Sequence, residues 1–437
     1  MKKTFLVSLL LLFIFPLSNW AQINVDSTKY KNIAKYKRFA DSCNKAIMKI
    51  ALEEERLKDS IKKIEQLERI KVLRKQDLDT TFHIKMDHLA IEEMPNISRF
   101  INVKQIDFYD NNIERVSKNI WPKSDSLLSA NFENNDLKRI SFKRNSPIKT
   151  LNLSHNHFKR IPRSIRKLKH LKSIDLSRNE IKRIPCFIQR MDSLEELKLN
   201  YNQLGNLSKR EIKRLRNIPI IHIGSNTINR LPENINLLRK ATVLNLGRNQ
   251  LSTLPSSFAQ LDSLQHLILY RNNFDSIPYV IFQLKELVEL DFYYNHLTEI
   301  PEEIGALEKL QQLFLAYNEI SSIPKSIFSL KHLKALYLHH NQIILIPKAI
   351  INMDELMYLD LGYNKIFEIP DMSGMRSLKE VDFQENNLAE FPYELLENKK
   401  LTHIFLMGNT FVMTKEERAE MEKLRKELSE IGIRFYF

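Results

Sequence analysis

Leucine and other apolar residues recur along most of this chain in one frame, Leu-x-Leu-x-x-Asn-x-Leu. From Asn226 to Asn364 the step between asparagines is always 23 residues, and elsewhere it varies from 21 to 24. One further, degenerate copy, FHIKMDHLAIEEMP, has Leu89 in place of the asparagine. Fifteen copies of one frame, at steps of 21 to 24 residues, predict a solenoid of stacked repeats. The asparagines are residues 111, 135, 156, 179, 202, 226, 249, 272, 295, 318, 341, 364, 386 and 409.

Within each copy, the alternation predicts a short strand followed by a turn. The two leucines of Leu-x-Leu point to the same side of a strand, so both face the core. Strands of successive copies then form one parallel sheet, roughly 4.8 Å apart. A proline follows the next apolar residues, as in Ile161-Pro162 and Ile300-Pro301, and forbids a further ladder hydrogen bond. No single copy can bury its apolar face, so the array folds only by stacking.

This frame resembles the leucine-rich repeat, specifically the 23-residue Leu-Pro class. That class includes bacterial exported proteins, plant Ras-group-related proteins and an animal Ras-pathway scaffold. The resemblance covers residues 82 to about 412, most of the chain. It implies an α/β solenoid of horseshoe form with a concave parallel β-sheet and a ladder of asparagines. It also implies a non-catalytic module that recognises a protein or peptide on its concave face.

The ends of the chain differ from the repeats, and we predict four parts: 1–21, 22–80, 81–412 and 413–437. Two lysines and an apolar run over residues 5–15 are typical of a signal peptide, with cleavage after Ala21. The Ala-Gln junction resembles signal peptides of Bacteroidota. We therefore expect export to the periplasm, the cell surface or the medium, with no transmembrane span in the mature chain. A chain that is not exported would instead be a cytoplasmic signalling scaffold.

The two segments that flank the repeats have helical signatures. Residues 22–80 are rich in lysine and glutamate, with apolar residues three and four apart, which predicts an amphipathic helical region. It could cap the first repeat, dimerise as a coiled coil or bind a membrane. At the other end, Thr414 and Glu417 read as a capping box that opens a helix through about Glu430. Gly432 would end that helix, and IRFYF would add a last strand that closes the core.

The residues between the fixed positions decide what the concave face can bind. Positions four, two and one before each asparagine should project from that face. They are polar in the early copies and aromatic from the ninth copy onward. Tyrosine is favoured at interfaces, although the rings could also pair across strands and stabilise the sheet, or stack on the faces of a glycan. The predicted ligand-binding residues are Tyr270, Asp291, Tyr293, Tyr294, Phe314, Tyr317, Tyr337, His339, Tyr358, Asp360 and Tyr363.

A second candidate surface is basic. Net charge is +14, and residues 137–190 hold sixteen lysines and arginines against two acids. Most follow the asparagine or the proline, which places them on loops and the convex side. Such a stripe would attach a structural envelope protein to an anionic surface. Nucleic acid is not expected as a partner, because we expect the chain to be exported. The stripe comprises Lys138, Arg139, Lys159, Arg160, Arg163, Lys182 and Arg183.

Nothing in the sequence predicts catalysis. The chain has no phosphate-binding glycine loop, His-Glu-x-x-His or Gly-x-Ser-x-Gly motif, and only 8 glycines in total. Its two cysteines, Cys43 and Cys186, make neither a disulfide framework nor a metal site. His339 and His340 are adjacent, so we expect their side chains on opposite faces of a strand and no metal between them. We predict no cofactor and leave the oligomeric state open.

Overall fold

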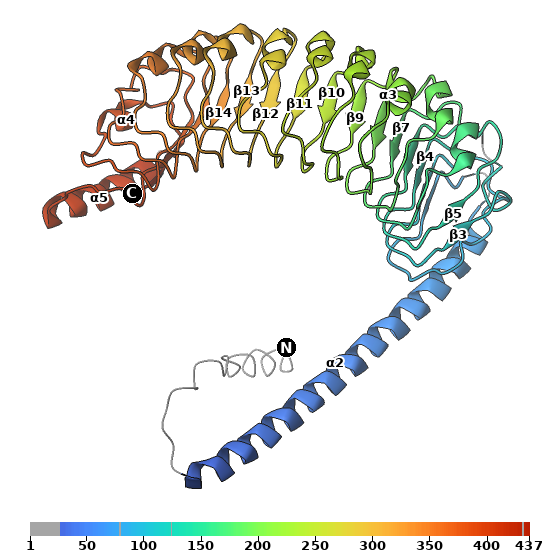
Figure 1. Cartoon of the computed structure of the whole chain (residues 1–437). Helices are drawn as coiled ribbons and strands as arrows, with labels where there is room; N and C mark the ends of the chain where they lie inside the picture. The colour runs from blue at the N-terminus through green and yellow to red at the C-terminus, as the bar shows by residue number, and fades with distance from the viewer. Residues whose placement is uncertain (1–26, 78–79, 124, 431) are drawn as a thin grey trace. The chain divides into compact units, whose positions relative to one another are not determined.

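The computed structural model describes residues 27–77, 80–123, 125–430 and 432–437 (Figure 1). The chain divides into two compact units, residues 1–65 and 66–437. The predicted signal peptide lies outside the described residues. Helix α2 (Ser27–Lys75) accounts for the described part of the first unit and opens the second. In the part of the chain that is described, no helix is long and apolar enough to cross a membrane.

The second unit is built on one parallel sheet, which the described residues show as 16 strands. Its strands follow the order of the chain, apart from two short strands, β3 (Arg115–Val116) and β5 (Arg139–Ile140), which pair separately. Within this unit the sheet lines the inner side of an arc (Figure 1). The predicted α/β solenoid with a concave parallel sheet is therefore confirmed. The strands of the sheet are β1 (His83–Lys85), β2 (Gln105–Asp107), β4 (Ser129–Asn131), β6 (Thr150–Asn152), β7 (Ser173–Asp175), β8 (Glu196–Lys198), β9 (Ile220–His222), β10 (Val243–Asn245), β11 (His266–Ile268), β12 (Glu289–Asp291), β13 (Gln312–Phe314), β14 (Ala335–Tyr337), β15 (Tyr358–Asp360), β16 (Glu380–Asp382), β17 (His403–Phe405) and β18 (Arg434–Tyr436).

The strands are in register, so equivalent residues of successive repeats meet. Leu290 pairs with Leu313, Leu313 with Leu336 and Leu336 with Leu359, and all four side chains are fully buried. Each strand therefore adds one layer to a continuous core. In β12, the residues on either side of the central leucine are half-buried and face away from the core. Surface residues at equivalent positions of successive repeats are therefore neighbours on the sheet.

The asparagines tie each repeat to the one before it. The Oδ1 atom of Asn318 accepts a hydrogen bond from the N–H of Leu297 at 3.0 Å. Its Nδ2 atom donates to the carbonyl of Phe292 in the preceding repeat at 3.0 Å and to that of Leu315 in its own repeat at 2.9 Å. This side chain therefore satisfies backbone groups of two turns that the core would otherwise leave unpaired. The asparagine ladder implied by the repeat is present, and it crosslinks repeats as well as closing its own turn.

Short 3₁₀ helices form the outer side of the arc (Figure 1). Each directly follows the repeat's proline, whose fixed φ suits a helix start and whose missing N–H is not needed there. One repeat has Ser208 instead, which forms a capping box with Glu211 and starts an α-helix, α3 (Lys209–Leu215). The 3₁₀ helices are η2 (Arg163–Lys167), η3 (Cys186–Arg190), η4 (Glu233–Leu238), η5 (Ser256–Gln260), η6 (Tyr279–Gln283), η7 (Glu302–Ala306), η8 (Lys325–Ser329) and η9 (Lys348–Asn352).

Both ends of the core are covered. At the first repeat, Leu73 of α2 is buried against the core, and Arg99 Nη2 donates to its carbonyl at 2.5 Å. At the last, β18 pairs with β17, and α5 (Lys415–Glu430) follows a short helix, α4 (Glu394–Glu397). Met421 of α5 is buried in the same core. These contacts support a capping role for the last turns of α2, whereas Leu57 and Ile64 farther upstream are exposed.

Candidate functional site

The residue before each asparagine forms a row along the edge of the sheet, which we call the rim. Its backbone is left-handed, with φ between 51° and 59° in every copy that carries a non-glycine residue there. Glycine adopts this conformation at little cost, and Gly408 fills the position once. Tyrosine, arginine and histidine are strained in this conformation, so contacts of their side chains must offset the free energy that the strained backbone costs.

At the rim of β12 to β15, four rings stack on one another. Ring centroids are 4.0 Å apart between Tyr294 and Tyr317, 4.0 Å between Tyr317 and His340, and 4.1 Å between His340 and Tyr363. The guanidinium of Arg271 lies 4.5 Å from the Tyr294 ring and extends the stack by one repeat. We call Tyr294, Tyr317, His340 and Tyr363 the rim stack. The rim stack therefore holds four planar rings face to face in one continuous row.

A second set of rings leans on the rim stack from the strand side. Tyr293 lies 4.7 Å from Tyr294 and 5.7 Å from His339, which comes from two repeats further on. The repeat between them has only Ala316 at this position, fully buried, so the two larger side chains meet above it. His339 also places its Nδ1 atom 2.8 Å from Oδ2 of Asp360.

A third row lies on the strands themselves. It contains Asp291, Phe314, Tyr337, Asp360 and Asp382, which are neighbours in the sheet register. The rings of Phe314 and Tyr337 stack at 5.0 Å with planes 2° apart. We call these five residues the acid–aromatic row. A carboxylate stands at one end of the ring pair, and two stand at the other.

Two of these carboxyl groups are protonated more readily than usual. Burial raises the pKa of Asp291 to about 7, and the charge of Glu289 adds to the effect. Burial, followed by the nearby charge of Asp360, raises the pKa of Asp382 to about 6. Among the described residues, no lysine, arginine or histidine lies within 4.0 Å of either as an ion-pair partner. The pKa of Tyr293 rises to about 12, again mainly through burial, so this phenol stays neutral.

The structure brings together most of the predicted concave residues. Tyr270 and Tyr358 lie farther out: the Tyr270 ring covers Gly247, where a Cβ would collide with it, and Tyr358 faces Ala335 and Glu380 on neighbouring strands. The residues joined by ring contacts, sheet register or the His339–Asp360 pair are Asp291, Tyr293, Tyr294, Phe314, Tyr317, Tyr337, His339, Asp360 and Tyr363.

The expectation that His339 and His340 point to opposite faces is wrong. Both follow the end of β14, and the left-handed turn at His340 (φ 52°) brings the two rings to 5.5 Å. Burial and the neighbouring His339 lower the pKa of His340, so it stacks as a neutral ring. Sequence reasoning also missed Asp382, although it occupies the same position, four before the asparagine, one copy further on.

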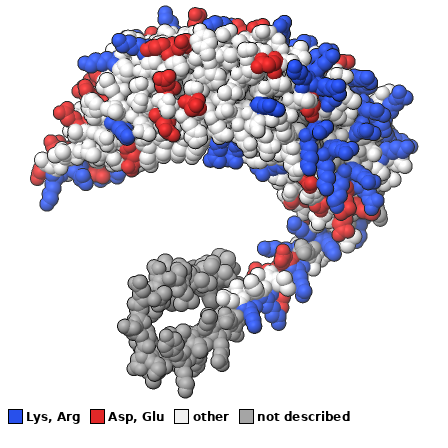
Figure 2. All heavy atoms as spheres, viewed as in Figure 1, with Lys and Arg blue, Asp and Glu red and all other residues white. Residues whose placement is uncertain are grey.

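The basic stripe lies outside the concave face. Its seven side chains are all exposed, and lysines and arginines gather over the N-terminal repeats of this unit (Figure 2). Of the seven, Lys138 alone has an ion-pair partner among the described residues, Glu114 at 3.1 Å. The stripe therefore presents positive charge that the described part of the protein leaves largely uncompensated.

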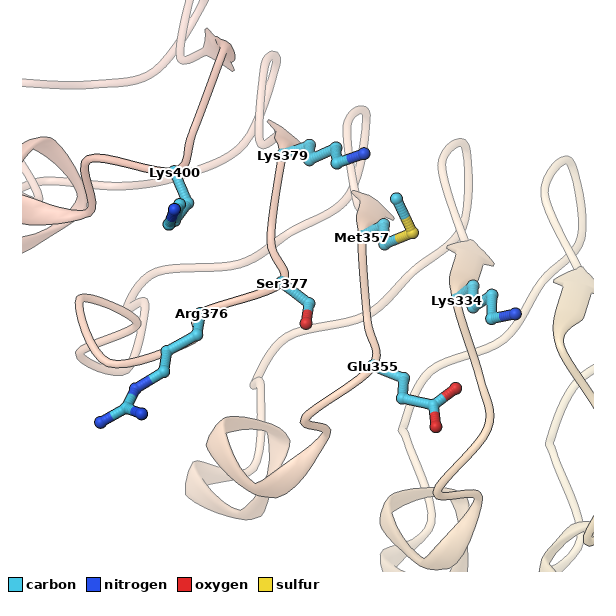
Figure 3. Close-up of a pocket in the computed structure, with 7 residues that line it drawn as sticks. All are labelled: Lys334, Glu355, Met357, Arg376, Ser377, Lys379 and Lys400. Carbon is cyan, nitrogen blue, oxygen red and sulfur yellow. The ribbon is translucent and has the colours of Figure 1, made fainter.

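An open pocket of about 380 Å³ lies near the C-terminal repeats (Figure 3). Its lining includes Lys334, Met357 and Lys379, which directly precede the first residues of β14, β15 and β16. The rim stack lies beyond the other end of these strands. No residue of the rim stack or of the strand rows described above lines the pocket, so the pocket and the aromatic surface are separate features.

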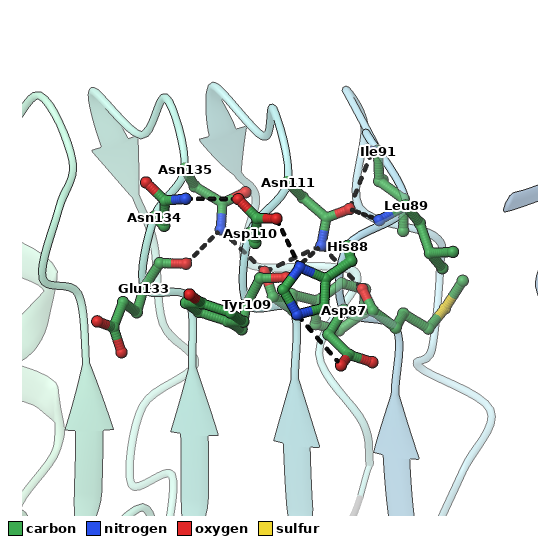
Figure 4. A network of polar contacts seen from close by, with 12 residues as sticks. Asp87, His88, Leu89, Ile91, Tyr109, Asp110, Asn111, Glu133, Asn134 and Asn135 are labelled. Atoms are coloured by element: carbon green, nitrogen blue, oxygen red, sulfur yellow. Dashed lines mark hydrogen bonds and ion pairs between the residues drawn. The ribbon is translucent and has the colours of Figure 1, made fainter. Parts of the chain in front are cut away.

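At the N-terminal end of the rim, His88, Asp110 and Asn134 form a network of polar contacts (Figure 4). Asp110 bridges two rim neighbours, with its Oδ2 atom 2.6 Å from Nδ1 of His88 and its Oδ1 atom accepting from the amide of Asn134. Beneath them Asn111 accepts from the N–H of Ile91 at 3.0 Å. Asp110 and Asn134 also line an open pocket of about 420 Å³ that extends along the rim to Arg178. The same rim thus changes from polar to aromatic along one unit.

Comparison with protein families found three matches to repeat families. The family described as leucine-rich repeat region matches residues 290–431. Two separate families, both described as leucine rich repeat, match residues 127–181 and residues 240–261. A search of curated proteins found no match to this sequence.

Solved structures with this fold include bacterial and plant proteins. A leucine-rich repeat protein of Leptospira interrogans is 27% identical with a TM-score of 0.69, and the match covers 84% of this chain and 98% of that one. The functional domain of InlJ from Listeria monocytogenes is 17% identical with a TM-score of 0.54, covering 76% of this chain and 64% of that one. The leucine-rich repeat ectodomain of the Arabidopsis thaliana receptor kinase GASSHO1/SCHENGEN3, solved with CASPARIAN STRIP INTEGRITY FACTOR 2, is 24% identical with a TM-score of 0.51, covering 74% and 44%.

Proposed function

Because the chain is a leucine-rich repeat protein, we propose that it is a non-catalytic recognition module that binds a protein or peptide on the concave face of β12 to β16. The observation that carries the proposal is the convergence of the rim stack with the acid–aromatic row. Solenoids present extended concave surfaces of this kind to their partners. The plant receptor ectodomain with this fold was solved with a partner. The signal-like N-terminal sequence favours a site of action outside the cytoplasm.

Exposure of the rings supports a binding role over sheet stabilisation alone. Tyr363, the last ring of the rim stack, is 42% exposed although it stacks on His340. Contiguous exposed rings favour association, because burying them against a partner removes apolar area from water. Tyrosine loses little conformational freedom on binding and can donate a hydrogen bond from its hydroxyl.

The test compares capture of a partner by the native protein and by Tyr317→Ser/Tyr337→Ser, using envelope extract at high salt. The matched control, Tyr201→Ser/Tyr279→Ser, removes two exposed tyrosines outside the cluster. Loss of two central aromatic anchors should weaken binding by about 100-fold or more, whereas the control should bind like the native protein. Melting temperatures are measured first, so that unfolding is not read as lost binding. Equal capture by all three proteins would refute the proposal.

A second candidate function rests on the uncompensated basic stripe: attachment of an envelope protein to an anionic surface. The variant Lys159→Gln/Arg160→Gln/Lys182→Gln/Arg183→Gln should no longer co-sediment with phosphatidylglycerol vesicles. Salt at about 0.5 M should release the native protein from the vesicles, because the Debye length is then only a few Å and charges on the surface are screened. Phosphatidylcholine vesicles are the control. Retention by the variant would exclude this surface. A fluorescence change with soluble wall glycans, absent in the tyrosine variant, would point to a glycan ligand instead.

A further inference from the structure

From β12 to β16, the charge of the concave face is opposite to that of the whole chain. Net charge is +14, yet no facing position from β12 to β16 carries lysine or arginine. The acids among these positions are Glu289, Asp291, Asp360, Glu380, Asp382 and Glu385. A partner chosen by overall charge would be acidic, whereas a partner chosen by this face would be basic.

The aspartates of this face are not required by the turns they occupy. Asp291 Oδ1 accepts a hydrogen bond from the N–H of Tyr293 at 2.9 Å. In other repeats, Asn131, Asn152 and Asn245 stand at the same position and accept the equivalent hydrogen bond at 3.0 to 3.1 Å. An asparagine would thus close the turn without placing a charge in a half-buried site. The carboxylates at residues 291, 360 and 382 need another explanation.

Burial of a carboxylate without a cation is unfavourable. Asp291 has no ion-pair partner among the described residues, and the partner of Asp360 is His339, at 2.8 Å, which is charged only when protonated. A cationic side chain from a ligand would pair with each and would be held at the same time by the neighbouring rings, since ring faces attract cations. The Phe314–Tyr337 pair between the acids offers an apolar surface at the centre of the row.

We propose that the acid–aromatic row binds an extended peptide segment that carries two cationic side chains, arginine or lysine, on either side of an apolar residue. This inference rests on the proposed function and names the class of its ligand. Asp291 and Asp360 lie three strands apart, on β12 and β15, which is about 14 Å at ~4.8 Å per strand. Residues i and i+4 of an extended chain are about 14 Å apart and point to the same side, as does residue i+2. The segment that fits is therefore cation-x-apolar-x-cation, lying across the strands.

The experiment selects binders of the full-length protein from a displayed library of random 12-residue peptides. We expect enrichment of lysine and arginine, with a preferred spacing of four between two cations and an apolar residue between them. Labelled peptides from this pool should bind Asp291→Asn and Asp360→Asn about tenfold more weakly than the native protein. The matched control is Asp175→Asn, which makes the same isosteric change where Asp175 accepts from the N–H of Ser177 at 2.8 Å in an early repeat. It should bind like the native protein.

The outcomes separate this inference from the function on which it rests. Enriched peptides that depend on Tyr317 and Tyr337 but lack cations, or that bind both acid variants normally, would overturn the cationic class and leave concave recognition standing. Enrichment of acidic peptides would likewise overturn it and point to the basic stripe. A selection that yields no peptide dependent on Tyr317 and Tyr337 would count against both.

Discussion

Asp291 offers a direct measure of the cost of placing a charge on the concave face. Its pKa is about 7 in the folded protein, against 3.8 for the ordinary side chain. The folded state therefore holds a proton that the unfolded state has lost, so stability falls as pH rises from about 4 to about 7. Three pKa units correspond to about 4 kcal/mol at most. Since the side chain keeps some contact with water, we expect about 2–4 kcal/mol.

The charged groups near Asp291 do not alter this sign. Glu289 on the same strand raises the pKa of Asp291 further, and it is itself paired with Nδ1 of His266 at 2.8 Å. The register neighbours on β11 and β13, Ile268 and Phe314, carry no charge. No cation of the described chain offsets the penalty, so the full cost falls on folding.

Asp291→Asn should remove this penalty while keeping the turn. Free energies of unfolding are measured by urea denaturation of native and variant proteins at pH 4.5, 6, 7 and 8. The variant should gain about 2–4 kcal/mol relative to the native protein between the lowest and the highest pH, because all other titrating groups cancel in the difference. Asp175→Asn serves as the control for the amide substitution itself. A difference that stays flat with pH, or that favours the native protein at pH 8, would refute the reasoning.

Two further predictions concern the scaffold. Asn318→Ala should lower the free energy of unfolding by roughly 3 kcal/mol, because side-chain hydrogen bonds of about 1 kcal/mol each are lost and buried backbone groups stay unpaired. The exposed Asn352→Ala should change it by less than about 0.5 kcal/mol in the same urea titration. Phe435→Ser in β18 should cost about 3 kcal/mol, since this side chain is 3% exposed in the closing layer of the core, whereas Tyr436→Ser, 38% exposed on the same strand, should cost clearly less. Equal losses in either pair would contradict these assignments.

Much of the scaffold could be predicted from the sequence because its determinants lie within one repeat. Two leucines spaced by one residue define the buried side of a strand, one asparagine satisfies the turn, and one proline starts the outer helix. Each of these rules acts within one repeat, and the regular period of the sequence is enough to predict that the repeats stack. The basic stripe followed in the same way, because Lys159 and Lys182 occupy equivalent places in adjacent repeats.

The composition of the candidate site could be predicted only in part. Counting back from each asparagine located Tyr293, Tyr317 and Asp291, and one more copy would have located Asp382. The orientation of His340 could not be derived from strand alternation, because the chain has already left the strand and turned left-handed at that residue.

What the sequence by itself determined about this protein is the repeat, its register and the identity of the surface positions, since these depend on residues within one period. What only the tertiary structure decided is how those surface residues meet. Tyr293 reaches His339 two repeats away because Ala316 leaves the space between them empty, and that contact depends on three repeats at once. The raised pKa of Asp291 likewise results from burial by neighbouring repeats, a property that no single repeat contains.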